Sequence, residues 1–322
     1  MSHFEDQTPP GEQGPPEDSP SGSRQSLDDL AAKIVVGTAE PLPDVPSNPA
    51  SLENIQTVPP PRQSNLPEDL RISWGWLHFL GFFFFGIISF VITQLAVGVY
   101  LVAQSHNARL SEKDFQQLIV SKPQVPIAAN VLLFGLIIFF LYITLSVMDG
   151  VPFWSTLGWR KLVPNSGAPS NPWLYFVGGI VLAIGVAIAS SRMKTPENLP
   201  IEELFKNRTG AFLLMGMAVL LAPLVEETVF RGYLYPLFAR SLGVAPAVVI
   251  TGVLFGFMHA PQLGWTLGLV SMLITVGIIL TLARARTGTV LASFLLHLGY
   301  NSMIAFSAIV STRGFTHMPP HP

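Results

Sequence analysis

The sequence predicts an all-α fold: a polytopic transmembrane helical bundle of seven to eight spans with a disordered N-terminal tail. Of the 322 residues, 49% are hydrophobic and only 12% are charged, against about 25% charged in soluble globular chains. From Trp76 onward, apolar runs recur at roughly the 20 residues needed to cross a ~30 Å bilayer core. Residues 1–70 are different, because they hold thirteen of the 28 prolines.

The N-terminal segment, residues 1–70, predicts a disordered acidic tail. It carries twelve Asp or Glu and three Lys or Arg, and such a composition buries too little apolar surface to offset the entropy of ordering. Within it, Ser26–Val36 is compatible with a transient amphipathic helix or with a plain solvated linker. The segment lacks the basic and apolar regions of a signal peptide.

The rest of the chain contains seven apolar segments. They are Trp76–Val102, Val125–Val147, Trp173–Ala189, Ala211–Phe238, Ala245–His259, Trp265–Ala283 and Thr289–Val310. The fifth is short, and an eighth span would arise if one long segment were broken. Tryptophans near several span ends fit an interfacial aromatic belt, and the loop Arg192–Arg208 predicts an amphipathic helix at the interface. We therefore expect an integral, multi-pass protein of the cell membrane.

Composition also excludes several classes of function. The chain has no cysteine, which excludes disulfides, Cys-ligated zinc and thiol nucleophiles. Its basic residues are scattered through loops, so we expect no nucleic-acid partner. The mildly basic body suits contact with anionic lipid head groups, but the Lys and Arg totals of alternate loops are too similar to set the membrane orientation.

Charged residues inside one span point to a functional site. Residues 211–310 contain six charges, and three of them, Glu226, Glu227 and Arg231, fall within the fourth span. An ionised side chain at the bilayer centre costs at least ~2.5–3.5 kcal/mol. Glu227 and Arg231 are four residues apart and can form an ion pair on one helix face. Glu226 is rotated by about 100° from Glu227 and remains available.

Polar residues in two further spans complete the candidate site. His259 ends the fifth span, and His297 and Asn301 lie four apart on one face of the last span. Each feature alone has a structural interpretation: an ion pair, an interfacial histidine, or interhelical hydrogen bonding. Three unrelated costly placements are a poorer explanation than one function, so we expect these side chains to meet at one hydrated pocket.

The same residues carry a family resemblance. Glu226-Glu227-Thr-Val-Phe-Arg231 reads EExxxR, Phe255-Gly-Phe-Met-His259 reads FxxxH, and His297-Leu-Gly-Tyr-Asn301 reads HxxxN. In this order the motifs resemble the CAAX protease and bacteriocin-processing (CPBP) family, as do the flanking Leu157-Gly158-Trp159-Arg160 and Thr287-Gly288. The resemblance covers residues 195–310. We accordingly divide the chain into the tail 1–70, N-terminal spans 71–194, a catalytic core 195–310 and a C-terminal tail 311–322.

The resemblance implies an intramembrane endopeptidase with no cofactor. In that family pattern Glu226 polarises a water held by His259, His297 and Asn301 form the oxyanion site, and Glu227 with Arg231 holds the helix. The implied partners are membrane lipid and a membrane-associated peptide or protein substrate, such as a CAAX-type or leader peptide.

Three alternatives remain open at this point. Glu226, His259 and His297 also form a plausible zinc ligand set, although the sequence lacks HExxH. Buried Glu and His serve proton-coupled transporters as well, but no internal repeat is visible. A non-catalytic immunity or scaffold protein is the third alternative, against which the intact set of motif residues argues.

Overall fold

The computed structural model describes residues 67–105, 111–164, 168–193 and 207–316, and every regular element in these ranges is a helix. The predicted tail up to residue 66, its segment Ser26–Val36, and most of the predicted interfacial helix Arg192–Arg208 lie outside the described residues.

Within these described ranges, six helices are long and apolar enough to cross a membrane, and the protein is an integral, multi-pass membrane protein. They are α2 Trp76–Ser105, the Gln124–Met148 run (α4 Gln124–Tyr142 and a π-helical end, Ile143–Met148), α6 Pro172–Ser190, the Arg208–Leu242 run, α11 Leu267–Thr287 and α12 Val290–Ser311. The seventh predicted segment is the shorter apolar helix α10, Val244–Met258. In the described residues, the long fourth segment stays one run, so the optional eighth span does not arise there.

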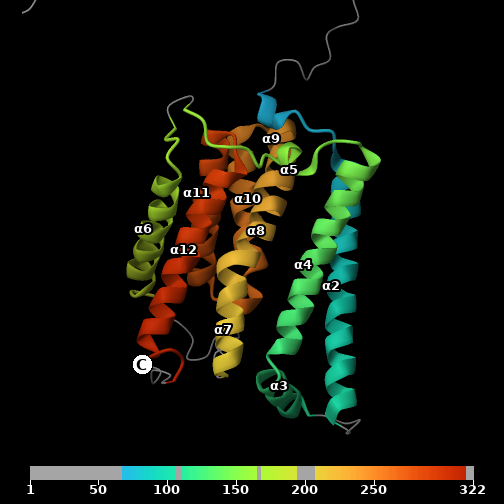
Figure 1. Cartoon of the computed structure of the whole chain (residues 1–322), viewed down its shortest axis with the longest axis vertical. Helices are drawn as coiled ribbons and strands as arrows, with labels where there is room; N and C mark the ends of the chain where they lie inside the picture. Colours follow the sequence, from blue (N-terminus) through green and yellow to red (C-terminus); the bar gives the residue numbers. More distant parts are fainter. Residues whose placement is uncertain (1–66, 106–110, 165–167, 194–206, 317–322) are drawn as a thin grey trace, which may run out of the picture. The chain divides into compact units, whose positions relative to one another are not determined.

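The Arg208–Leu242 run is the central helix of the bundle (Figure 1). It consists of α7 Arg208–Gly216, a π-helical stretch Met217–Leu221, α8 Ala222–Glu227, a second π-helical stretch Thr228–Leu234 and α9 Tyr235–Leu242. Pro223 and Pro236 interrupt the α-helical hydrogen-bond pattern because proline has no N–H. Short π-helical turns are frequent at functional sites.

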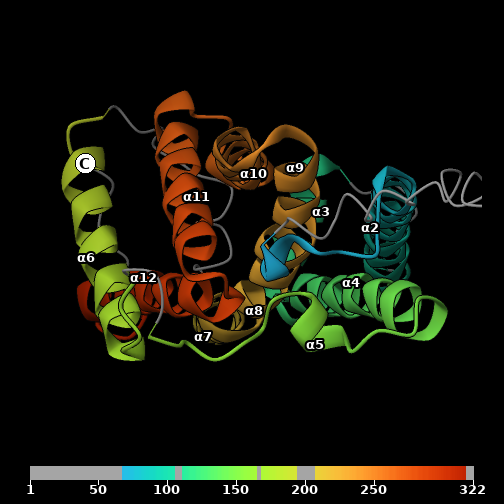
Figure 2. The ribbon, with the colours of Figure 1, turned by 90° about the horizontal axis from the view of Figure 1, so that it is seen from above.

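The other long helices flank this run on two sides. Figures 1 and 2 place α2 and α4 on one side and α6, α11 and α12 on the other. The pairs α6–α12 and α10–α11 pack most closely, and glycines make this possible. A Cβ on Gly179 would lie 1.9 Å from the Leu296 carbonyl oxygen, and one on Gly299 would lie 2.0 Å from that of Phe176.

Four short helices complete the described structure. They are the 3₁₀ helices Glu68–Leu70 and Pro261–Leu263, α3 Glu112–Ser121, which begins with a capping box from Ser111, and α5 Phe153–Thr156. Glu68–Leu70 lies on the tail side of the predicted boundary after residue 70, yet Leu70 belongs to the hydrophobic core. The reason is an apolar pattern, Leu70, Ile72 and Trp74, that begins before the boundary and is buried throughout.

Candidate functional site

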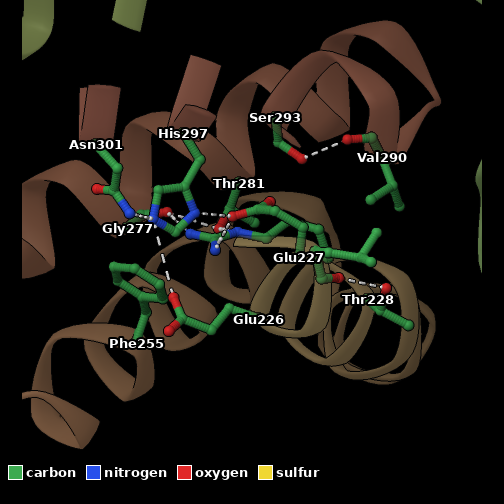
Figure 3. Close-up of polar contacts among 12 residues, drawn as sticks. Glu226, Glu227, Thr228, Phe255, Gly277, Thr281, Val290, Ser293, His297 and Asn301 are labelled. Carbon is green, nitrogen blue, oxygen red and sulfur yellow. Dashed lines mark hydrogen bonds and ion pairs between the residues drawn. The ribbon is translucent and has the colours of Figure 1, made fainter. Parts of the chain in front are cut away.

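The structure brings all six predicted site residues to one place. Figure 3 shows four of them, Glu226, Glu227, His297 and Asn301, side by side. Glu226 and Glu227 end α8, and Arg231 follows in the π-helical stretch Thr228–Leu234. His259 is the residue directly after α10, and His297 and Asn301 lie on α12. Three separate helices therefore contribute to the cluster, as their separate placement in the sequence predicts.

Glu227 and Arg231 form a fully buried ion pair. Arg231 Nη1 donates to Glu227 Oε1 at 2.7 Å, and both side chains are 0% exposed. This is the i,i+4 pair that the spacing predicts, and its burial means that neither charge has solvent to compensate for loss of the other.

Arg231 has further partners that the sequence motifs did not indicate. Its Nε donates to Thr281 Oγ1 at 3.2 Å, and its Nη2 donates to the Gly277 carbonyl oxygen at 2.8 Å. The guanidinium carbon lies 4.6 Å from the centre of the Phe255 ring, within cation–π range. Phe255 stands in the FxxxH motif, but Thr281 and Gly277 are part of an apolar run on α11 and give no signal of their own.

His297 links the buried ion pair to Asn301. Its Nδ1 lies 2.9 Å from Glu227 Oε1, and because a carboxylate accepts, Nδ1 carries the proton and donates. Asn301 Nδ2 donates to the Ala218 carbonyl oxygen at 2.7 Å and lies 3.3 Å from His297 Nε2. The carbonyl of Ala218 thus fixes the orientation of the Asn301 amide, with its NH₂ group toward His297.

Glu226 faces both imidazoles without contacting either directly. Its Oε1 lies 3.8 Å from His259 Nε2, and its Oε2 lies 3.9 Å from His297 Nε2. These separations exceed a direct hydrogen bond and suit a bridging water. The Glu226 side chain is 11% exposed, whereas that of Glu227 is 0% exposed.

The other nitrogen of His259 fixes its tautomer. Nδ1 lies 2.8 Å from the Phe255 carbonyl oxygen, which can only accept, so Nδ1 is the donor. In the neutral ring Nε2 is then unprotonated and presents its lone pair toward Glu226. A water placed between these two acceptors donates one hydrogen bond to each, which leaves the lone pairs of its oxygen free to face a third group.

Glu226, His259 and His297 are the zinc ligands of the alternative metal-dependent mechanism. Within the described ranges, no three His, Asp or Glu side chains are arranged to hold a metal ion.

A cavity of about 540 Å³ lies elsewhere in the bundle, where α6, α11 and α12 meet, and Arg286 and Tyr175 are among its lining residues. None of the six site residues lines it, so it is not the predicted hydrated pocket.

Comparison with known proteins assigns this region to a family. Residues 208–303 match the family described as "Type II CAAX prenyl endopeptidase Rce1-like". The chain is also similar to an Escherichia coli protein described as "Uncharacterized 24.3 kDa protein", with 30% identity over 148 residues, which is 44% of this chain and 66% of that protein. No solved structure matches the chain. The segment 208–303, which holds all six site residues, is therefore similar to the Rce1-like CAAX endopeptidase family, consistent with the CPBP resemblance of the sequence motifs.

Proposed function

We propose that this chain is an intramembrane endopeptidase that hydrolyses a membrane-associated, CAAX-type peptide with a water activated by Glu226. The observation that carries the proposal is the placement of Glu226 between His259 Nε2 and His297 Nε2, at 3.8 and 3.9 Å. The neighbouring Glu227 is already bound by Arg231 and His297, so Glu226 is the carboxylate left to act on a water.

The proposed reaction begins with a water bound between Glu226 and His259. Both groups accept hydrogen bonds in the neutral-imidazole state, so the water offers its lone pair to the scissile carbonyl carbon. Glu226 takes one proton as general base while the C–O bond forms. The protonated Glu226 then gives this proton to the leaving amine as the C–N bond breaks, which yields an amine and a carboxylic acid that keeps the second proton of the water, and restores the Glu226 carboxylate.

His297 and Asn301 are proposed to stabilise the oxyanion of the tetrahedral intermediate. One N–H of Asn301 is used by Ala218, which leaves the second N–H for a substrate oxygen. His297 acts as a donor when Nε2 carries a proton. The two nitrogens are 3.3 Å apart, close enough for both to reach one oxygen, and each such donor is worth about 2.7–4 kcal/mol in the transition state.

The test is cleavage of a reporter peptide that ends in a prenylated cysteine followed by three residues, by purified protein in lipid vesicles. We expect Glu226→Gln to reduce kcat by about 10²–10⁴ with KM nearly unchanged, while Asp114→Asn, at an exposed helix cap, retains full activity. The same peptide without the prenyl group tests the CAAX-type preference. Equal cleavage by wild type and Glu226→Gln would remove the proposed role of Glu226.

Two contacts also suit a metal-dependent mechanism, in which Glu226, His259 and His297 would bind zinc after moving from the arrangement described above. Metal-bound histidines commonly donate their second N–H to a carboxylate or carbonyl, as His297 does to Glu227 and His259 to Phe255. Zinc analysis of the purified protein, combined with cleavage before and after chelation, separates the two mechanisms. Stoichiometric zinc with chelator-sensitive cleavage would favour the metal.

A further inference from the structure

Two tryptophans outside the predicted site donate hydrogen bonds to the helix segment that carries Arg231. Trp159 Nε1 donates to Thr228 Oγ1 at 3.1 Å, and Trp74 Nε1 donates to the Tyr233 carbonyl oxygen at 3.1 Å. Thr228 and Tyr233 lie near the two ends of the π-helical stretch Thr228–Leu234. The two indoles therefore hold this segment at both ends; we call them the indole clamp.

The segment between the indoles needs outside support because its own hydrogen bonding is irregular. The N–H of Tyr235 bonds to the Phe230 carbonyl, five residues back, and Pro236 supplies no N–H at all. The backbone pattern is thus interrupted next to Tyr233, whose carbonyl accepts a hydrogen bond from Trp74. Trp74 is 0% exposed and stacks on the Tyr233 ring at 5.4 Å with an interplanar angle of 17°.

Trp74 is itself held firmly. Arg240 donates to the carbonyl oxygens of Ile72 and Trp74, each at 3.1 Å. Asp69, a few residues earlier, forms an ion pair with the buried Arg284 at 2.9 Å. The stretch that carries Trp74 is therefore anchored to α9 and α11.

Hydrogen bonds to the neighbouring backbone also fix the position of Trp159. The N–H of Val290 donates to the Gly158 carbonyl at 2.9 Å, and Thr289 Oγ1 donates to the Arg160 carbonyl at 2.6 Å. Gly232 lets the Leu157 backbone approach, because a Cβ there would lie 2.9 Å from the Leu157 carbonyl oxygen. These contacts explain the Leu157-Gly158-Trp159-Arg160 motif physically, because they place the indole N–H of Trp159 against the helix segment that carries Arg231.

We propose that Trp74 and Trp159 are positioning residues for the reaction, acting through the helix segment that places Glu226, Glu227 and Arg231. This inference rests on the proposed endopeptidase function. Glu226 and Glu227 directly precede the clamped segment, and Arg231 lies inside it. A displacement of about 1 Å in a catalytic group costs on the order of 10²-fold in rate, so a small release of this segment has a measurable effect.

The test compares Trp74→Phe and Trp159→Phe with Trp173→Phe. Phenylalanine keeps an aromatic ring but removes the N–H donor together with part of the indole ring system, so Thr228→Val, described below, is the variant that removes a clamp hydrogen bond and keeps both indoles. Trp173, which is 70% exposed at the start of α6, is the control for a Trp→Phe change outside the clamp. With the prenylated reporter peptide, we expect kcat to fall about tenfold in each clamp variant with KM within about twofold, because substrate binding is not the step disturbed. Trp173→Phe should match wild type.

A partner-side variant and a second readout make the test decisive. Thr228→Val removes the acceptor of Trp159, so it should lower kcat as Trp159→Phe does, and the double variant should be no worse than either single variant. Hydrogen exchange at amides 229–235 should quicken in both clamp variants while amides of α11 stay protected. Unchanged kcat, additive loss in the double variant, or unchanged exchange would each overturn the proposal. If Glu226→Gln cleaves as well as wild type, the proposed function fails, and the exchange result alone decides the clamp.

Discussion

The buried ion pair leads to a prediction about stability that can be worked from the structure. In Arg231→Met, Glu227 keeps its charge with no solvent access, and breaking such a pair costs about 3–5 kcal/mol. Arg231 also donates to Thr281 Oγ1 and the Gly277 carbonyl, but these two groups keep the hydrogen bond between them, so their loss of Arg231 adds little to this cost. His297 still donates to Glu227, so the net loss should lie near the lower end, at about 3–4 kcal/mol.

The double variant Glu227→Gln/Arg231→Met separates charge compensation from simple loss of contacts. It removes both charges, so it should be more stable than Arg231→Met although it carries one more substitution. Unfolding in detergent micelles, followed for wild type, the two single variants and the double variant, gives the coupling energy between the residues.

Arg240→Met is the matched control for this cycle. Arg240 hydrogen-bonds two backbone carbonyls, and none of the ion pairs found in the described residues involves it, so its loss should cost less than that of Arg231. Additive losses in the double variant, or an Arg231→Met protein as stable as wild type, would refute the assignment of this pair as a mutually compensating buried pair.

Three further outcomes follow from the site and its supports. Asn301→Ala should lower kcat by about 10²–10³ in the reporter-peptide assay, and an unchanged rate would remove Asn301 from the oxyanion site. Gly179→Ala should lower the melting temperature because its Cβ would lie 1.9 Å from the Leu296 carbonyl oxygen. Gly178→Ala, which has open space around it, should leave the stability unchanged or raise it by up to about 1 kcal/mol through helix propensity. Equal effects of the two variants would contradict the close α6–α12 crossing. Asp69→Asn should destabilise the protein in the same unfolding measurement, since Arg284 would keep a buried charge without its 2.9 Å partner, and an unchanged midpoint would show that this pair is dispensable.

Much of the fold could be predicted because a bilayer leaves only a few solutions for an apolar chain. Each long apolar run became a helix, and the short run Ala245–His259 became the short helix α10. Local spacing also predicted the Glu227–Arg231 contact, since residues four apart share a helix face. The prediction that three helices meet at one site was based instead on how rarely polar groups occur in apolar spans. The structure supports it with the contact between Glu227 and His297, which are 70 residues apart.

The supports of the site could not be predicted, and the reason is physical. Thr281 and Gly277 lie 50 and 46 residues from Arg231, and Trp74 lies 159 residues from Tyr233. A threonine, a glycine or a tryptophan costs little in an apolar run or near its end, so none stands out as a charge does. The sequence analysis assigned the tryptophans near span ends to an aromatic belt at the membrane interface, whereas the structure completely buries one of them, Trp74.

The two adjacent glutamates lie in different environments because the helix turns them toward different neighbours. Adjacent residues differ by about 100° around a helix, and here that rotation takes Glu227 to a site with no exposure and Glu226 to a site with 11% exposure. Glu227 meets a guanidinium and an imidazole N–H, which hold it as a fixed charge. Glu226 meets two imidazole nitrogens at distances that leave room for water. A carboxylate that already accepts two hydrogen bonds is a poor base. A largely buried carboxylate without a direct hydrogen bond costs free energy unless a water molecule hydrogen-bonds to it. In the proposed mechanism Glu227 is the fixed charge that orients His297 and Glu226 is the carboxylate that binds the water. One residue cannot do both, which is a physical reason for two glutamates at the start of this motif.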